Sequence, residues 1–246
     1  MENSEFYKRI DDLADRAERR GIVTRTAFLT PAKVYALNQY HRGGGLVLTG
    51  GLEGCERQVA FFLPAFLEEG DLDIREHIRA LRIEAPFGAP GHRDYLGAAL
   101  GLGIGRESLG DIRVGGGTAY VFCLSSVAPV LLEELKKVGR WGVKVSSCAL
   151  EDVPTAVVKA KALSFTVKSL RLDAVTGALF GLSRTAAAEQ IRMGLVSLNY
   201  ALCDRIDAPV AAGDVISLRG RGKGRVTAIG GRSKKDRLFV EAETFL

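Results

Sequence analysis

The sequence lacks several features that mark particular classes of site. Its four cysteines lie far apart without a CxxC pair, and its three histidines form no HExxH motif. Neither a zinc site nor a disulfide framework is therefore expected. One uncharged run, residues 114–132, is as long as a short membrane span, but it contains three glycines, two serines and a proline. That composition favours a turn, a strand and a helix start over a membrane helix.

Nucleotide-binding and export signals are also missing. The chain has no Walker A motif, and the glycines in residues 101–105 lack the spacing of a dinucleotide-binding loop. His92-Arg93-Asp94 matches part of a kinase catalytic loop, but the accompanying DFG motif and strand lysine do not occur, so Asp94 is interpreted as part of a helix start. The charged N-terminus has no apolar signal segment. We therefore expect a cytoplasmic protein without a cofactor, a metal or an active site.

Positive charge is concentrated near the C-terminus. Residues 165–246 contain 13 Lys and Arg against 8 Asp and Glu, whereas residues 1–164 balance at 21 of each. Within the basic part, residues 219–237 hold eight basic residues and one acid, Asp236. Such a density favours a polyanionic partner. A solvated surface hairpin would produce the same pattern, so the charge alone leaves both interpretations open.

The hydrophobic periodicity predicts an α+β fold of three small domains. Residues 1–76 form an α-rich N-terminal domain, with one helix ending at Gly21, a second beginning at Thr30-Pro31, and a hairpin over 46–64. Residues 77–152 show the order βαββαβ of a ferredoxin-like domain, with helices over 94–102 and 129–138. Tyr120 and Phe122 alternate on one of its strands, where they stack on bases or pack against the helices.

The C-terminal domain, residues 165–246, follows a predicted linker over 151–165. An apolar stripe marks its first helix, which Ser169 is expected to cap and Gly181 to end. Ser183 caps the second helix. A small sheet of short strands completes the domain, with turns expected at 212–214 and 230–231.

One face of the second helix has the features of a phosphate-binding surface. Thr185, Ala188 and Arg192 lie on one stripe, with Arg184 beside it. Alanine leaves the backbone open to close approach, and the helix N-terminus at Ser183 offers donors to an anion. The donor forks of the arginines suit phosphate oxygens. A structural helix with two surface arginines fits the same residues equally well.

A family resemblance separates these interpretations. RLDAVTGALFGLSRTAAAEQIRMGLVSLN, followed by GDVISLRGRGKGRV, resembles the S4 RNA-binding domain, which binds structured RNA, mostly ribosomal RNA or tRNA, through two helices and the adjoining loop. The resemblance implies RNA contacts at Arg171, Ser183, Arg184, Thr185, Arg192 and Asn199. The basic segment adds flanking support at Arg219, Arg221 and Lys223.

The rest of the chain resembles a narrower family. FLTPAKVYALNQY, GGLEGCERQVAFFLP and HRDYLGAALGLGIGRESLGDIRV are similar to segments of YlmH-like (photosystem II S4 domain) proteins, with one departure at Cys55, where alanine is expected. Membership implies a non-enzymatic factor of the large ribosomal subunit that acts on stalled nascent chain–tRNA complexes in ribosome quality control. The implied partners are structured RNA and that subunit, without a membrane. His92 and Arg93 lie in one of these segments and are candidates for a second RNA or ribosome contact.

An enzymatic alternative remains. RLDAVTGAL resembles in part the RLDxxTxGL motif of pseudouridine synthases, whose aspartate is the nucleophile, and Asp173 would then take that role. Ala178 stands where this motif has glycine. Only residues 174–246 follow Asp173, and the S4 pattern occupies them, so no catalytic sheet is left for such an enzyme.

Overall fold

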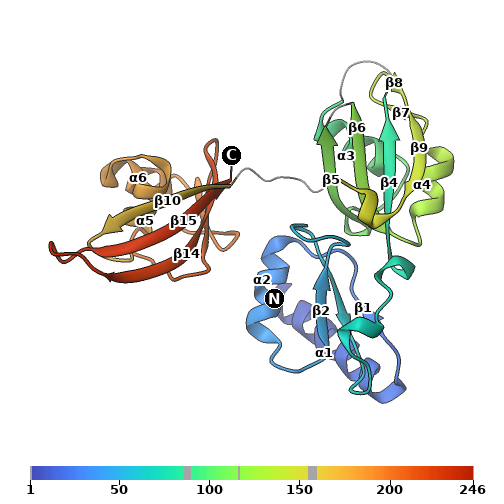
Figure 1. The fold of residues 1–246 in the computed structure, drawn as a ribbon, viewed down its shortest axis with the longest axis horizontal. Coiled ribbons are helices and arrows are strands. Elements are labelled where there is room, and N and C mark those ends of the chain that lie inside the picture. The colour runs from blue at the N-terminus through green and yellow to red at the C-terminus, as the bar shows by residue number, and fades with distance from the viewer. Residues whose placement is uncertain (1, 86–89, 116, 155–159, 246) are drawn as a thin grey trace. The chain divides into compact units, whose positions relative to one another are not determined.

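The chain forms two compact units, Met1–Ala156 and Val157–Leu246, shown in Figure 1. The computed structural model describes residues 2–85, 90–115, 117–154 and 160–245. Both units combine helices with antiparallel sheets, which confirms the predicted mixture of α and β structure. Across these described ranges, no helix has both the length and the apolar character needed to span a bilayer.

Unit 1 contains two main sheets, one of order β1-β3-β2 and one of order β5-β6-β4-β9, with a separate β7–β8 hairpin. Its helices and strands are α1 (Glu2–Arg20), β1 (Thr24–Arg25), α2 (Pro31–Tyr40), β2 (Leu46–Thr49), β3 (Val59–Phe62), β4 (Ile78–Glu84), α3 (His92–Gly101), β5 (Leu109–Gly115), β6 (Thr118–Leu124), α4 (Ala128–Glu134), β7 (Lys137–Val138), β8 (Trp141–Gly142) and β9 (Lys144–Cys148).

The helices predicted near the N-terminus are present. Ile10 and Ala17 of α1 are buried in the core below the first sheet, and the helix ends before Gly21, whose φ of 61° suits glycine. Thr30 caps α2 by accepting a hydrogen bond from the backbone N–H of Lys33 at 3.4 Å. Strands β2 and β3 pair antiparallel, which confirms the predicted hairpin.

The second sheet has the topology that the order βαββαβ predicts. Strand β6 lies between β5 and β4, and every pair in the sheet is antiparallel, as in a split βαβ unit. Helices α3 and α4 pack on one face, where Leu81, Val121 and Leu131 are buried. The predicted helix over 129–138 ends early, at Glu134, because the chain turns into the β7–β8 hairpin.

The opposite face of this sheet packs against the N-terminal part of unit 1. Phe122 is fully buried there in a core that also holds Phe61 and Ile78. Base stacking by Phe122 is therefore excluded, and the residue packs against the N-terminal sheet rather than against helices. Tyr120 is half-buried at the edge of the same core. The predicted division between residues 76 and 77 thus falls inside one compact unit.

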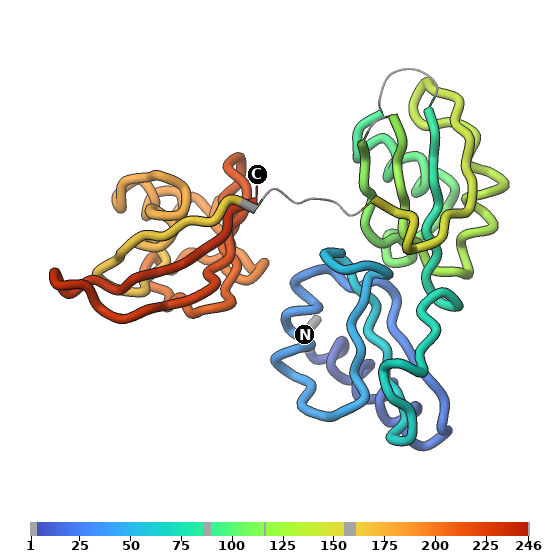
Figure 2. The backbone as a smooth tube through the Cα atoms, in the orientation of Figure 1, coloured from blue at the N-terminus to red at the C-terminus, as the bar shows by residue number. Residues whose placement is uncertain are grey.

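Unit 2 is a six-stranded antiparallel sheet of order β10-β15-β14-β13-β11-β12 with two helices. In Figure 2, β10 runs beside β15 over its whole length. The elements are β10 (Ala160–Val167), α5 (Leu172–Phe180), α6 (Arg184–Arg192), β11 (Val196–Leu198), β12 (Ala201–Leu202), β13 (Val215–Leu218), β14 (Gly222–Arg232) and β15 (Leu238–Phe245).

Three local predictions for this unit are wrong. Part of the predicted linker, residues 160–165, is strand, because β10 pairs with β15. The turn expected at 230–231 lies at Ser233–Asp236 instead, because the two glycines sit at a register shift within β14. Helix α5 begins after Arg171 rather than after Ser169, without a side-chain cap.

Candidate nucleic-acid interface

The two helices of unit 2 meet in a tight connection. Gly181 ends α5 in the left-handed conformation with a φ of 65°, and Ser183 caps α6 by accepting from the backbone N–H of Ala186 at 3.1 Å. A Cβ atom at Gly177 would lie 3.0 Å from the carbonyl oxygen of Leu182. Glycine at that position allows the connection to pass close to α5, which brings the start of α6 beside it.

An ion-pair cluster joins the helices at this point. The carboxylate of Asp173 accepts from Arg171 Nε at 3.2 Å, from Arg184 Nε at 2.9 Å and from the backbone N–H of Ala174 at 2.8 Å. The Asp173 side chain is 5% exposed, whereas the Arg184 side chain is 54% exposed. Arg184 therefore presents its two Nη groups outward, and within the described part of the chain neither has a hydrogen-bond partner.

The pKa of Asp173 lies below its ordinary value. Burial alone would raise this pKa, but the hydrogen bonds and positive charges of Arg171 and Arg184 outweigh the burial. Asp173 is thus a buried anion held by two cations, which is the arrangement of a structural carboxylate. It shows no open approach for a substrate of the kind that a nucleophile needs.

The surface of α6 agrees only in part with the predicted phosphate-binding stripe. Ser183, Thr185 and Arg192 are exposed, and Arg192 has no internal ion pair or hydrogen bond among the described residues. Ala188 is buried, so the centre of this helix is not open to close approach as expected. The exposed surface of α6 is accordingly made by its first two residues, by Glu189 and by Arg192.

Asn199 has an internal structural role. It adopts a left-handed conformation with a φ of 50° between β11 and β12. Its amide donates to the Asp214 carboxylate at 2.8 Å, and its carbonyl oxygen accepts from the backbone N–H of Val215 at 2.9 Å. These bonds fix the turn against the start of β13, so the polar atoms of Asn199 are engaged inside the unit.

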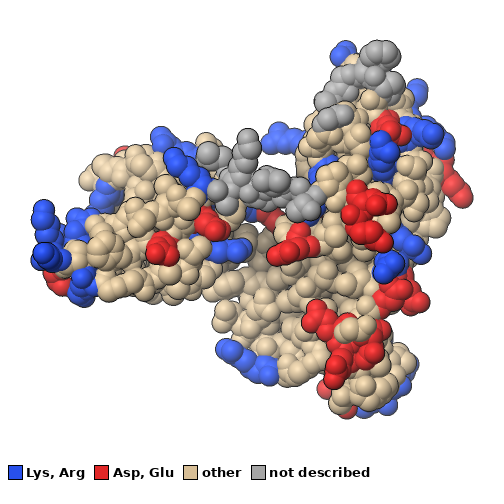
Figure 3. Space-filling model, viewed as in Figure 1, with Lys and Arg blue, Asp and Glu red and all other residues tan. Residues whose placement is uncertain are grey.

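The basic segment is divided between the two ends of β14. Arg219 and Arg221 lie at the β13–β14 turn, where both are exposed and Arg221 donates to the carbonyl of Phe180 at 3.3 Å. Lys223 and Arg225 lie at the start of β14. The remaining four, Arg232, Lys234, Lys235 and Arg237, lie at the β14–β15 turn, and Figure 3 shows Lys and Arg side chains gathered at that free end. An eleven-residue strand separates the two groups by roughly 30 Å. The predicted single basic hairpin is therefore two separate groups.

Lys223 differs from the other basic residues of this segment. It is half-buried on β14, and its Nζ lies 5.7 Å from the centre of the Phe245 ring. Burial, followed by the nearby charge of Arg225, lowers the pKa of this lysine. Its contact with an aromatic ring leaves it less available to RNA than Arg219.

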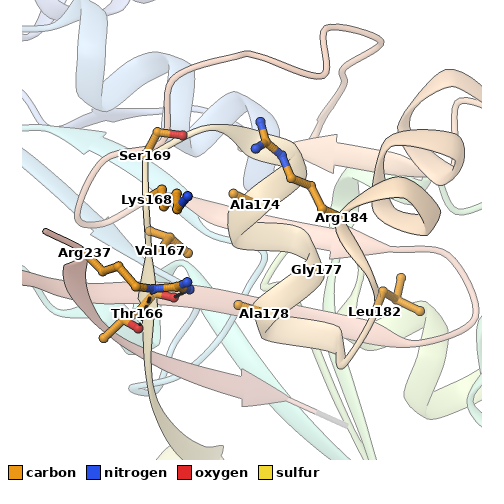
Figure 4. Close-up of a pocket in the computed structure, with 10 residues that line it drawn as sticks. All are labelled: Thr166, Val167, Lys168, Ser169, Ala174, Gly177, Ala178, Leu182, Arg184 and Arg237. Carbon is orange, nitrogen blue, oxygen red and sulfur yellow. Dashed lines mark hydrogen bonds between the residues drawn. The ribbon is translucent and has the colours of Figure 1, made fainter. Parts of the chain in front are cut away.

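Beside the ion-pair cluster, a groove of about 300 Å³ lies between the end of β10 and α5. Figure 4 shows Ala174, Gly177 and Ala178 in the middle, with Arg184 on one side and the β10 residues on the other. Three cations border the groove, namely Lys168, Arg184 and Arg237. Arg237 is held by its Nε, which donates to the Thr166 hydroxyl at 2.9 Å. The small residues admit a ligand close to the backbone, and the cations favour an anionic one.

Sequence reasoning did not select Lys168 or Arg237 as site residues. Lys168 follows β10 and Arg237 precedes β15, 69 positions later in the chain. Only the pairing of β10 with β15 brings the two residues to the same groove. Ser169 was expected as a helix cap but lines the groove instead. Two signals were available: Arg237 belongs to the basic segment over 219–237, and Lys168 lies three residues before Arg171, where the S4 pattern begins.

His92 and Arg93 lie in unit 1, whereas the groove is formed by residues of unit 2. Both are exposed in the first turn of α3, and the Asp94 carboxylate accepts from the backbone N–H of Gly91 at 2.8 Å. The expected helix start is therefore confirmed, while a ligand contact at these residues stays a prediction. In the ranges that the structure describes, no group of three or more His, Cys, Asp or Glu residues is arranged to hold a metal ion.

Comparisons with known proteins agree with this architecture. Residues 73–152 match the family model described as "Putative RNA-binding domain in YlmH". A Bacillus subtilis (strain 168) protein named "Ribosome-associated protein quality control protein P2" is 30% identical over 199 residues, which are 81% of this chain and 77% of the relative. The chain belongs to the YlmH-like family.

The family assignment covers both units. The family model spans β4 to β9 of unit 1, which is the split βαβ sheet. A solved structure named "Cell division protein ylmH from Streptococcus pneumoniae" is also similar, at 21% identity and a TM-score of 0.47, over 63% of this chain and 96% of that chain. The Bacillus subtilis relative and the family model confirm, at the level of the family, the resemblance that the sequence motifs indicated.

Proposed function

We propose that this YlmH-like protein binds structured RNA through unit 2 and acts without catalysis as a translation or ribosome quality-control factor. Ribosomal RNA of the large subunit is the proposed main target, with tRNA as an additional one, and the proposed compartment is the cytoplasm. The name of the Bacillus subtilis relative supports the ribosomal part of this proposal. The description of the matching family model supports RNA binding by the protein, although that model matches residues 73–152 of unit 1 rather than unit 2.

The observation that carries the proposal is the groove beside α5. Lys168, Arg184 and Arg237 come from three separate segments of the chain and border one floor of small residues. Arginine forks and lysine charges at such a floor suit the oxygens of an RNA backbone. The exposed Arg192 at the end of α6 and Arg219 at the β13–β14 turn are proposed as further phosphate contacts, and the Nη groups of Arg184 complete the set.

The residues that the S4 resemblance implies divide into two roles under this proposal. Arg184, Thr185, Arg192 and Arg219 meet RNA directly. Arg171 and Asn199 support the surface from inside, because the first pairs with Asp173 and the second ties the β11–β12 turn to Val215. Ser183 caps α6 and thereby orients the helix that carries two of the direct contacts.

The pseudouridine synthase alternative finds less support. Its nucleophile would be Asp173, whose carboxylate is nearly buried and accepts four internal hydrogen bonds. An assay separates the two functions. We expect the purified protein to leave uridine in ribosomal RNA and tRNA unchanged, and isomerisation that disappears in Asp173→Asn would establish the enzyme instead.

Sedimentation in sucrose gradients tests the proposed function. A lysate containing the full chain is compared with one containing Lys168→Gln/Arg192→Gln, which removes two exposed charges from the proposed surface. We expect the wild type in the fractions of the large subunit and the variant near the top of the gradient. Wild-type protein at the top would contradict a ribosomal target.

A matched variant controls for net charge. Lys161→Gln/Arg225→Gln also removes two exposed charges from unit 2, but neither residue lines the groove or lies on α6. We expect this control to sediment like the wild type. If both variants move to the top equally, binding depends on total charge and the groove is not the contact.

A further inference from the structure

A second cavity lies within unit 1, with a volume of about 600 Å³. It is open to solvent on one side and is lined by α1, by the segment between β1 and α2, by Lys33 of α2, by Arg57 before β3 and by the turn before β5. Its lining contains four basic residues, Arg9, Lys33, Arg57 and Arg106, and two acidic residues, Glu5 and Glu107. The cavity therefore has an excess of positive charge, although residues 1–164 as a whole are neutral.

The two inner arginines have only neutral partners. Arg57 donates from Nε to the carbonyl of Leu109 at 2.9 Å and from Nη2 to the carbonyls of Phe28 and Arg106 at 3.1 and 3.3 Å. Arg106 donates from Nη1 to the carbonyls of Leu109 and Gly110 at 2.7 and 3.3 Å. Among the residues described, no carboxylate forms an ion pair with either guanidinium. Arg57 Nη1 and Arg106 Nε and Nη2 keep donors that no described residue accepts.

Asp111 lies close enough to act on both arginines but forms no ion pair with either of them. Both oxygens of Asp111 accept backbone N–H groups, from Glu56 at 2.7 Å and from Arg57 at 3.0 Å. Burial lowers the pKa of Arg57 and of Arg106, and for Arg57 the positive charge of Arg106 lowers it further. The negative charge of Asp111, and for Arg57 that of Glu107, offset these shifts only in part. Guanidinium groups stay protonated at neutral pH despite such shifts. The two half-buried guanidinium groups thus repel each other and keep N–H donors that no described residue accepts. An anion bound between them would reduce this repulsion.

The mouth of the cavity adds an apolar surface and two exposed positive charges. Phe6 of α1 lines it, with the Lys33 Nζ 5.5 Å from the centre of the ring. Arg9 and Lys33 are exposed there. A cavity of this size falls within the range that holds small ligands. An aromatic ring beside several cations suits a ligand that combines a planar ring with a phosphate group.

We propose that this cavity binds a phosphate-bearing ligand of mononucleotide size, with the phosphate group against Arg57 and Arg106 and the base against Phe6. The ligand is a free nucleotide or the phosphorylated end of an RNA strand, since both carry the same chemistry. This site goes beyond the function proposed for unit 2, because it lies in unit 1 and uses none of the same residues.

Isothermal titration calorimetry on the full chain tests the site. The chain carries Lys168→Gln/Arg192→Gln, which removes the proposed RNA contacts of unit 2. Adenosine 5′-monophosphate is expected to bind saturably, and adenosine is not. Because Arg57 and Arg106 hold backbone carbonyls, the added substitutions are placed at the mouth. Arg9→Gln/Lys33→Gln should weaken binding by about tenfold or more.

The control is Lys8→Gln/Arg16→Gln, which removes the same charge from exposed positions of α1 outside the cavity. We expect its affinity for the nucleotide to stay within about twofold of the parent. A 5′-phosphorylated diadenylate that binds more tightly than the monophosphate identifies an RNA end, and the reverse order identifies a free nucleotide. The proposal would be overturned if neither the monophosphate nor the diadenylate binds saturably. It would also be overturned if Arg9→Gln/Lys33→Gln and Lys8→Gln/Arg16→Gln weaken binding equally.

Discussion

Arg184 in α6 donates its Nε–H to Oδ2 of Asp173 in α5 at 2.9 Å, and the carboxylate that it meets is 5% exposed. The same guanidinium borders the groove with more than half of its side chain exposed. One residue therefore joins the two helices through its inner nitrogen and offers its outer nitrogens to a ligand. Stability and RNA affinity are expected to be coupled at Arg184 and separate at Arg192.

Charge reversal at the two arginines tests this difference. Arg192→Glu should change the free energy of unfolding by less than about 0.5 kcal/mol, because the side chain is exposed and has no described partner. Arg184→Glu should lower it by about 2 kcal/mol, because it places a second anion beside the buried Asp173. Urea unfolding gives both values. Both variants should bind RNA weakly in a filter-binding assay. Equal stability of the two variants would show that the Asp173 pair contributes nothing to the fold.

Asp173 should make the free energy of unfolding depend on pH in the acidic range. An aspartate in an unfolded chain titrates near pH 4, whereas folding lowers the pKa of Asp173 below that value. The stabilisation that this group supplies is thus complete above about pH 4 and is lost as the pH falls further, toward the folded pKa. Asp173→Asn cannot titrate and should be less stable than the wild type at pH 7.

The measurement is the difference in unfolding free energy between wild type and Asp173→Asn across the pH range. We expect a constant difference from about pH 7 to pH 5 and a decrease below about pH 4. A difference that grows on acidification would mean that the pKa of Asp173 is raised in the folded protein. That result would also reopen the question of a chemical role for this carboxylate.

Asn199 should matter for the fold more than for RNA contact. Asn199→Ala loses two side-chain hydrogen bonds and must adopt positive φ, so it should cost about 2 kcal/mol of stability. Asn199→Gly keeps the conformation and should recover part of that loss. RNA affinity, measured well below the unfolding temperature, should fall less than twofold in either variant. A tenfold loss of affinity without a loss of stability would instead identify Asn199 as a direct contact.

RNA binding should weaken steeply with salt. Each phosphate that unit 2 neutralises is expected to contribute a slope of roughly −0.7 to −0.9 to the plot of log affinity against log salt. The Lys168→Gln/Arg192→Gln variant should reduce the magnitude of the slope by about two such steps, because it removes two of the proposed contacts. Affinity that stays flat between low and moderate salt would contradict binding through phosphates.

Local patterns in the sequence predicted a large part of the secondary structure. The cap at Thr30, the apolar spacing in α1 and the glycine after α5 each act within a few residues, so the corresponding helix ends follow from the chain itself. The βαββαβ order has few compact solutions, and the sheet order β5-β6-β4-β9 is one of them. The motifs of the YlmH-like family could be recognised in the sequence because each of them is one contiguous stretch of residues.

The sequence predicted that every residue of the S4 pattern, including Arg171 and Asn199, contacts RNA. The order of residues does not show which of these side chains bind a partner within the protein. Arg171 pairs with Asp173 only two positions away, but the structure also pairs Arg184 with Asp173 across two helices and ties Asn199 to the residues that begin β13. The last two contacts depend on distances between segments that are separated in the chain. The order of residues does not encode them in any local pattern.

The end of α1, the start of α2, the start of α6 and the net charge were therefore determined by the order of the residues, since each follows from composition or from chemistry within one turn. The end of α4 and the start of α5 were not. The groove beside α5 and the cavity around Arg57 and Arg106 arose only on folding. Lys168 meets Arg237 because β10 pairs with β15, and Arg57 meets Arg106 because the two sheets of unit 1 pack together. Long-range packing brings these cations close together despite their mutual repulsion. The free energy that offsets this repulsion comes from the burial of apolar residues elsewhere in each unit.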